Sequence, residues 1–215
     1  MIKKITPHSA LAEMISIFLL CWPCHTMAMD LTLEDRTAIY DSYSLEKSGN
    51  YERATQKMNS VYLAHKNNFL INIRLGRLFS LTKKYNNSIE HYEAAAKLAP
   101  ESIEPWLALS LIYLNMETFE KSLNASVQVL RRDKFHYDGL SRSAAALIRM
   151  KRYREALLKV EEALQLYPID ATLLEQKALI LVSLGNVDSA KEFLNLLLVI
   201  SPENPYALSI LQAQR

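Results

Sequence analysis

The chain has 215 residues, of which 50% are hydrophobic and 22% are charged, and its formal net charge at pH 7 is +2. This length and apolar content suffice for one elongated domain, and the near-balance of charge provides no overall field that would draw the chain to nucleic acid or to an acidic membrane. Only 4 glycines occur, and no strand-like alternation stands out, so we expect an all-α protein.

The first 28 residues have the pattern of a secretory signal peptide. A short basic start precedes the apolar run Met14–Trp22, and Thr26-Met27-Ala28 has small residues at both positions that a signal peptidase reads. We therefore predict a signal peptide at 1–28, cleaved after Ala28. The alternative is a retained membrane anchor, but an anchor needs about 20 apolar residues, and this run is shorter and is followed by Pro23.

Both cysteines of the chain, Cys21 and Cys24, lie in this segment. Their spacing is that of a redox motif, but such a motif acts at the head of a helix in a folded domain, and this segment is expected to be removed. We therefore assign the pair no redox role. The mature chain would then contain no cysteine, which suits an oxidising compartment.

From residue 35 onward, one pattern recurs every 34 residues. Two small residues stand twelve positions apart, and a bulky residue precedes the second small residue by three. The first small residues are Ser42, Gly76, Ser110, Ala144 and Ala178, the bulky ones are Tyr51, Tyr85, Phe119, Tyr153 and Val187, and the second small ones are Ala54, Ser88, Ser122, Ala156 and Ala190. Small residues let two antiparallel helices approach closely, so this period predicts a solenoid of stacked helix pairs.

The pattern resembles the tetratricopeptide repeat family. The third period has that family's tryptophan at Trp106, and the second has Leu75-Gly76. The resemblance implies an all-α solenoid in which a lead-in at 29–34 precedes five units, and the residues from Pro205 onward form a capping helix at 205–215. The units are 35–68, 69–102, 103–136, 137–170 and 171–204. The residues expected to pack the repeats are Gly76, Trp106, Ala144, Tyr153, Ala156 and Ala190.

No set of residues in the expected mature chain indicates catalysis. His65, His91 and His136 do not share a helical face at metal-binding spacing, and no glycine-rich phosphate loop occurs. We therefore predict a protein that is not an enzyme and that has no cofactor and no metal.

The resemblance also implies where partners bind, because in this family they lie along the inner, concave surface formed by the first helices. Transferring those positions gives an apolar centre in the third unit, flanked by arginines. The predicted partner-binding residues are Tyr40, Tyr43, Ile73, Arg74, Arg77, Leu107, Leu111, Leu114, Arg142, Ile148 and Arg149. Guanidinium groups bind carboxylates through two parallel hydrogen bonds, so we expect a peptide or helical segment that bears acidic groups. Charge reversal at Arg74 and Arg77 should weaken binding and leave folding intact.

The family and the signal segment together favour an exported, periplasmic scaffold or assembly factor for an envelope machine, such as a secretion, pilus or polysaccharide-export system. Two alternatives remain: a membrane-tethered subunit that keeps its first residues as an inner-membrane anchor, and a non-catalytic regulatory module of a separate enzyme. The pattern identifies neither the partner nor the oligomeric state.

Overall fold

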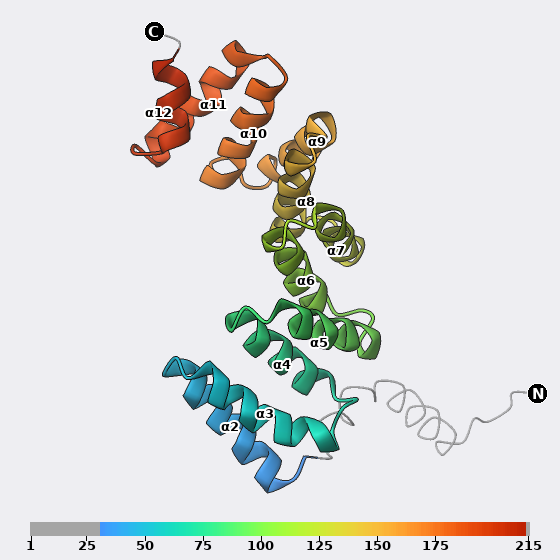
Figure 1. Ribbon diagram of the computed structural model, residues 1–215. Coiled ribbons are helices and arrows are strands. Elements are labelled where there is room, and N and C mark those ends of the chain that lie inside the picture. Colours follow the sequence, from blue (N-terminus) through green and yellow to red (C-terminus); the bar gives the residue numbers. More distant parts are fainter. Residues whose placement is uncertain (1–30, 214–215) are drawn as a thin grey trace, which may run out of the picture.

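A computed structural model describes residues 31–213 as a stack of helices that runs from α2 at one end to α12 at the other (Figure 1). The helices are α2 (Leu33–Lys47), α3 (Tyr51–Ala64), α4 (Phe69–Leu81), α5 (Tyr85–Leu98), α6 (Glu104–Asn115), α7 (Phe119–Arg132), α8 (Tyr137–Arg149), α9 (Tyr153–Leu164), α10 (Ala171–Ser183), α11 (Val187–Ile200) and α12 (Pro205–Gln212). The described residues contain no strand. The predicted all-α solenoid is therefore confirmed, whereas the expected signal peptide lies outside the described residues.

The small residues of each period lie where the two helices of a pair touch. All ten are buried, and most are completely inaccessible to solvent. In the second pair the hydroxyl of Ser88 donates to the carbonyl oxygen of Gly76 over 2.6 Å, and in the third pair the hydroxyl of Ser122 donates to the carbonyl oxygen of Ser110 over 2.8 Å. Such bonds between a side chain and a neighbouring helix backbone require closely approaching axes, which only small residues permit.

The bulky residue of each period is the first residue of the second helix. The residue two positions earlier has a positive φ in all five pairs, because the turn between the helices passes through the left-handed region. Glycine fills this position at Gly49 (77°) and Gly185 (82°), whereas Lys83 (57°), Glu117 (57°) and Lys151 (60°) adopt it with a side chain. Three of the five turns therefore use a conformation that side chains disfavour.

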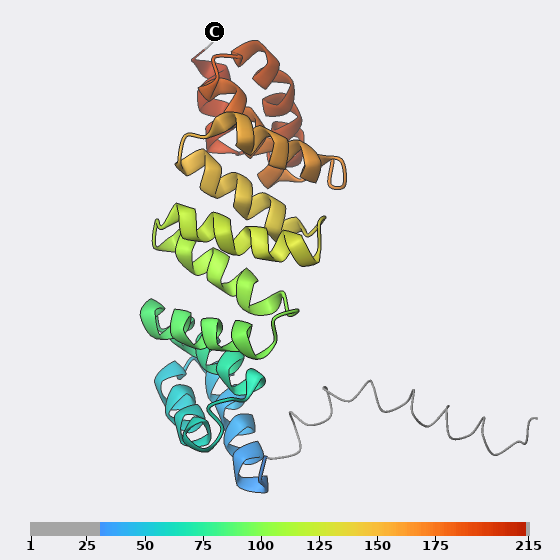
Figure 2. The same ribbon diagram turned by 90° about the vertical axis from the view of Figure 1, so that its right-hand side faces the viewer.

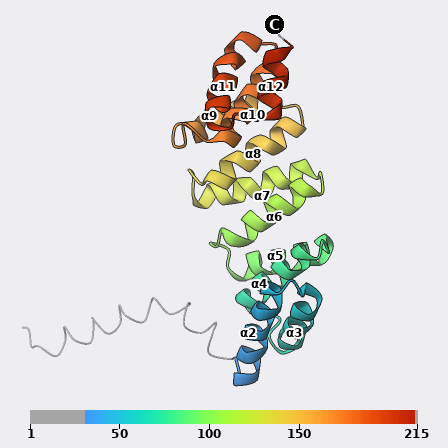
Figure 3. The same cartoon turned by 90° about the vertical axis from the view of Figure 1, so that its left-hand side faces the viewer.

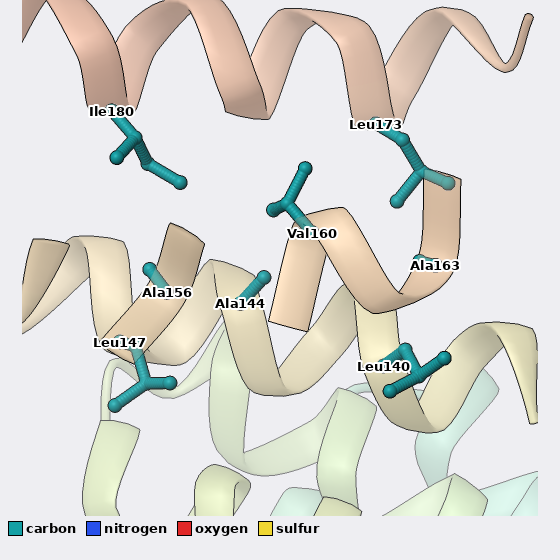
Figure 4. Packing of buried hydrophobic residues seen from close by; sticks show 8 residues of the cluster. All are labelled: Leu140, Ala144, Leu147, Ala156, Val160, Ala163, Leu173 and Ile180. Atoms are coloured by element: carbon teal, nitrogen blue, oxygen red, sulfur yellow. The ribbon is translucent and has the colours of Figure 1, made fainter. Parts of the chain in front are cut away.

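The core consists of successive clusters along the stack, in which the first helix of one pair packs against the pair before it. Figure 4 shows one such cluster, drawn from α8, α9 and α10. Its buried members are Leu140, Ala144, Leu147, Ala156, Val160, Ala163, Leu173 and Ile180. Tyr153 packs against this cluster, and Trp106 packs against a second cluster that contains Tyr92 and Leu109.

The stack ends at α12, whose Ala207 is completely buried against Leu194 and Leu197 of α11. This short helix packs on the apolar face of the fifth pair. Figures 2 and 3 show the helix pairs following one another along a single axis, so that each pair contacts its neighbours in the stack. Among residues 31–213, no helix has both the length and the apolar character needed to cross a membrane.

Candidate functional site

A hollow of about 390 Å³ opens between α2 and α4 on the surface formed by the first helices of the pairs, here called the first-helix face. Ile39, Tyr40 and Tyr43 of α2 line it on one side, and Leu70 and Ile73 of α4 line it on the other. Tyr40 is 76% exposed, and Tyr43 and Leu70 are each 55% exposed. Several large apolar side chains that are exposed next to one another around a hollow indicate a binding surface.

Charged side chains surround this apolar floor. Arg36, Arg77 and Glu104 also line the hollow, and all three are exposed. Nε of Arg77 donates to Oε1 of Glu46 over 2.9 Å, but the side chain of Arg77 remains 61% exposed. Burial raises the pKa of Glu46, but the hydrogen bonds from Arg74 and Arg77 outweigh burial and hold this pKa below its usual range. The carboxylate is therefore ionised and joins α2 to α4.

Arg74 occupies a different environment from the one that we predicted. It is 4% exposed, its Nη1 is hydrogen-bonded to Glu46, and its Nε donates to Oγ of Ser42 over 3.1 Å. Its guanidinium carbon lies 3.8 Å from the centroid of the Tyr43 ring, which covers it. Arg74 is thus a buried connection between the first two pairs, and reversing its charge would disturb folding. Only Arg77 of these two arginines remains suitable for a test of binding.

Arg142 makes a similar connection two pairs further along the stack, between α8 and α6. Its Nη1 donates to the carbonyl oxygen of Leu107 over 2.7 Å and to Oγ of Ser110 over 3.1 Å, while its Nη2 donates to Oδ1 of Asp138 over 2.9 Å. Arg142 and Arg74 each reach a serine 32 residues earlier in the chain. Each arginine therefore donates two hydrogen bonds to the preceding first helix.

The remaining predicted residues are dispersed along the first-helix face. Leu111 is 43% exposed, whereas Leu107 and Leu114 are partly buried and Ile148 packs against the core cluster of α8–α10. The side chain of Arg149 is 54% exposed, but its Nη2 donates to Oε1 of Glu117 over 2.9 Å. The structure therefore brings together Tyr40, Tyr43, Ile73, Arg74 and Arg77 around one hollow, and it separates the others from this group.

Our reasoning from the sequence missed Leu70 and Glu46. Leu70 lies 34 residues after Arg36 and 34 before Glu104, and all three line the hollow, so the repeat period could have identified it. Glu46 lies in the last turn of α2 and is recognisable only through its two arginine partners on the next first helix.

The histidines lie away from the hollow. Nδ1 of the buried His91 is 3.0 Å from Oδ1 of Asn72, and its ring stacks on Phe79 at 5.4 Å between centroids. Burial lowers the pKa of His91 and outweighs the opposing effect of Glu90. Nε2 of His65 lies 3.0 Å from Oδ2 of Asp35. No group of three or more metal-ligating side chains occurs among the described residues.

Comparison with known proteins relates the chain to one protein family. Two family models described as tetratricopeptide repeats match residues 71–102 and 147–214. Tetratricopeptide repeat protein 33 of Homo sapiens is 56% identical over 45 residues, which make up 21% of this chain and only 17% of that protein.

Solved structures with similar folds include a tetratricopeptide repeat protein and several structures of the protein MamA. A tetratricopeptide repeat protein from Parabacteroides merdae superposes with a TM-score of 0.77 at 17% identity, covering 83% of this chain and 71% of that one. MamA from Desulfovibrio magneticus superposes with a TM-score of 0.75 at 12% identity, covering 81% of this chain and 98% of that one. At these identities the likeness shows a shared fold.

Proposed function

The chain belongs to the tetratricopeptide repeat family, and from this premise we propose that it binds a segment of a partner protein in the hollow between α2 and α4. The repeats form a scaffold for protein–protein interaction, and the family and its fold are generally non-catalytic. The observation that carries the proposal is the grouping of Tyr40, Tyr43 and Leu70, all more than half exposed, around one hollow on the first-helix face.

The side chains around the hollow suit an apolar anchor with an acidic neighbour. Tyrosine rings provide a large contact area at a low cost in side-chain entropy, and they are frequent in binding hot spots. Arg36 and Arg77 would meet a carboxylate at the rim, since guanidinium groups match carboxylate geometry. The hollow is short, so an extended peptide or one face of a helix would fill it with a few residues.

Photo-cross-linking in cells tests this assignment. A photoreactive residue at Tyr40 should capture a partner protein, and Tyr40→Ala in a tagged protein should reduce recovery of that partner without lowering the melting temperature. Leu158 is the matched control, because it is 66% exposed but belongs to α9, a second helix. Equal capture from both positions, or unchanged recovery with Tyr40→Ala, would remove the hollow as the binding site.

We extend the proposal to an exported protein that serves as a scaffold or assembly factor of an envelope machine such as a secretion, pilus or polysaccharide-export system. The apolar run and the small residues before Met29 support export. Mass spectrometry of the N-terminal peptide tests it: a mature protein that begins at Met29 fits export to the periplasm, and an intact Met1 at the membrane fits a tethered subunit. A captured partner that is an enzyme, with activity that changes on binding, would instead support a regulatory module.

A further inference from the structure

The turns that connect each second helix to the next first helix form one edge of the rod, here called the turn edge. Figure 2 shows the α7–α8 and α9–α10 turns on the same side of the molecule. Direct contacts join neighbouring turns. Nε of Arg132 donates to the carbonyl oxygen of Pro100 over 2.7 Å, and the hydroxyl of Tyr137 donates to Oδ1 of Asp170 over 3.1 Å. The edge is therefore a continuous surface built by several pairs.

Large apolar side chains are exposed on two neighbouring turns of this edge. Ile169 is 68% exposed, Phe135 is 50% exposed, Leu166 is 47% exposed and Tyr167 is 40% exposed. These residues follow the ends of α7 and α9, so they belong to the turns between helices. The preceding α5–α6 turn has Pro100, Glu101 and Ser102 in the corresponding region, so the apolar patch does not extend to that turn.

Cations accompany the apolar groups. Arg131 and Lys134 are exposed, and Nζ of Lys134 lies 5.0 Å from the centroid of the Phe135 ring. The acidic residue of this turn, Asp133, accepts a hydrogen bond from the backbone N–H of Phe135 over 3.2 Å and so helps to shape the turn. The two turns that carry the apolar patch, residues 131–136 and 165–170, contain three cations (Arg131, Arg132 and Lys134) and two acidic residues (Asp133 and Asp170), so their net charge is +1.

We propose that the turn edge docks on an anionic lipid surface. Phe135 and Ile169 would enter the boundary between headgroups and acyl chains, while Arg131 and Lys134 would meet the lipid phosphates. Apolar side chains on protruding turns fit a deformable lipid interface, whereas a protein partner would have to supply a matching hollow. Aromatic residues next to Lys and Arg are typical of surfaces that lie in the membrane interface, and clustered cations favour anionic lipids.

This surface is separate from the hollow between α2 and α4, so the two proposals stand independently. The hollow belongs to the first-helix face of the first two pairs, and the patch belongs to the turns of the third, fourth and fifth pairs. A protein that uses both could present a bound partner segment at one end of the rod while its middle rests on a membrane.

Vesicle sedimentation with the full-length chain tests the proposal. Vesicles of phosphatidylcholine with about one third phosphatidylglycerol should bind the wild type. The double variant Phe135→Ser/Ile169→Ser should bind at least about tenfold more weakly. Leu158→Ser is the matched control, because Leu158 is 66% exposed and lies on α9 away from the turns. Every variant keeps residues 1–30, so a difference between variants reports on the edge alone.

The charge of the turn edge and the depth at which it enters the bilayer provide two further tests. Arg131→Glu/Lys134→Glu should weaken binding and reduce its dependence on salt, whereas Arg154→Glu, at the start of α9, should not. In vesicles that contain brominated lipid, a tryptophan introduced by Phe135→Trp should be quenched more than one introduced by Leu158→Trp. Circular dichroism and melting temperatures should match the wild type throughout.

Three results would overturn the lipid proposal. The wild type could fail to bind anionic vesicles, the edge variants could bind as well as the Leu158 control, or residues 135 and 158 could be quenched equally. Loss of a captured protein partner by the edge variants, with vesicle binding intact, would reassign this surface to protein docking. Tyr40→Ala should not affect vesicle binding, so failure here and failure of the proposed function can be told apart.

Discussion

Gly76 is the position at which the close approach of two helices can be tested most directly. A Cβ atom at this residue would lie 2.9 Å from Cδ2 and Cε2 of Tyr92, whereas carbon atoms pack favourably at about 3.5–4.0 Å. Tyr92 is only 6% exposed, and the hydroxyl of Ser88 holds the second helix against the carbonyl oxygen of Gly76. The ring therefore has little room to move away from the new methyl group.

Two opposing effects set the size of the loss for Gly76→Ala. Alanine inside a helix is more stable than glycine by about 0.5–1 kcal/mol, and overpacking a tight core costs about 1–3 kcal/mol. We therefore expect the free energy of unfolding to fall by about 0.5–2 kcal/mol. A longer side chain, as in Gly76→Leu, should cost more.

Urea unfolding followed by circular dichroism measures this loss, and a double-mutant cycle shows where it originates. In a Tyr92→Leu background the ring is absent, so Gly76→Ala should become neutral or stabilising, and the coupling energy should account for the difference. If Gly76→Ala stabilises the wild-type chain, or if the cycle shows no coupling, the contact between Gly76 and Tyr92 does not limit the approach of α4 and α5.

Three further predictions concern stability. Arg74→Ala should lower the free energy of unfolding by about 3 kcal/mol, because it leaves the buried partners of Arg74 without their hydrogen bonds. Arg77→Ala should lower it by less than about 1 kcal/mol, because Arg77 is exposed. Equal losses for the two variants in urea unfolding would contradict this prediction. Lys151→Gly should gain up to about 1 kcal/mol by relieving its left-handed φ, whereas Gly185→Ala should destabilise; a lower melting temperature for Lys151→Gly would argue against strain there. The pKa of His91 lies below its ordinary 6.5, so as the pH falls the imidazole is protonated in the unfolded chain before it is protonated in the folded one. The free energy of unfolding should therefore fall as the pH decreases from about 7 to 5. This pH dependence should be smaller in His91→Gln, and an identical pH profile in that variant would contradict the prediction.

The repeat pattern predicted the fold well because its constraints act within one helix pair. A small residue at Ala54 or Ala156 is needed wherever two helices touch, and each of these residues is completely buried. The bulky residue three positions earlier opens the second helix in every pair.

The candidate site was only partly predictable because its charged residues have partners in other pairs. Arg74 was interpreted as a free cation, since nothing near it in the sequence indicates that Glu46 and Ser42 meet its guanidinium. The sequence does contain a signal for these contacts, but it lies between residues of neighbouring periods. Ser42 precedes Arg74 by 32 residues and Ser110 precedes Arg142 by 32, and both pairs are hydrogen-bonded. Comparison of polar pairs across neighbouring periods would have indicated this connection.

This use of polar residues explains why the hollow lies at the α2 end of the described stack. The register position of Arg74 and Arg142 is occupied by Gln176 in the fifth pair, whose Nε2 donates to the carbonyl oxygen of Ser141 over 3.2 Å on the preceding first helix. In the first pair the same position is Tyr40, and no first helix precedes α2 within the described residues. Within the described residues Tyr40 has no such helix to reach, and its ring is 76% exposed. Along the rest of the first-helix face, the side chains at three of these positions form hydrogen bonds that hold neighbouring pairs together. The contacts that stabilise the rod therefore leave fewer side chains there to bind a partner.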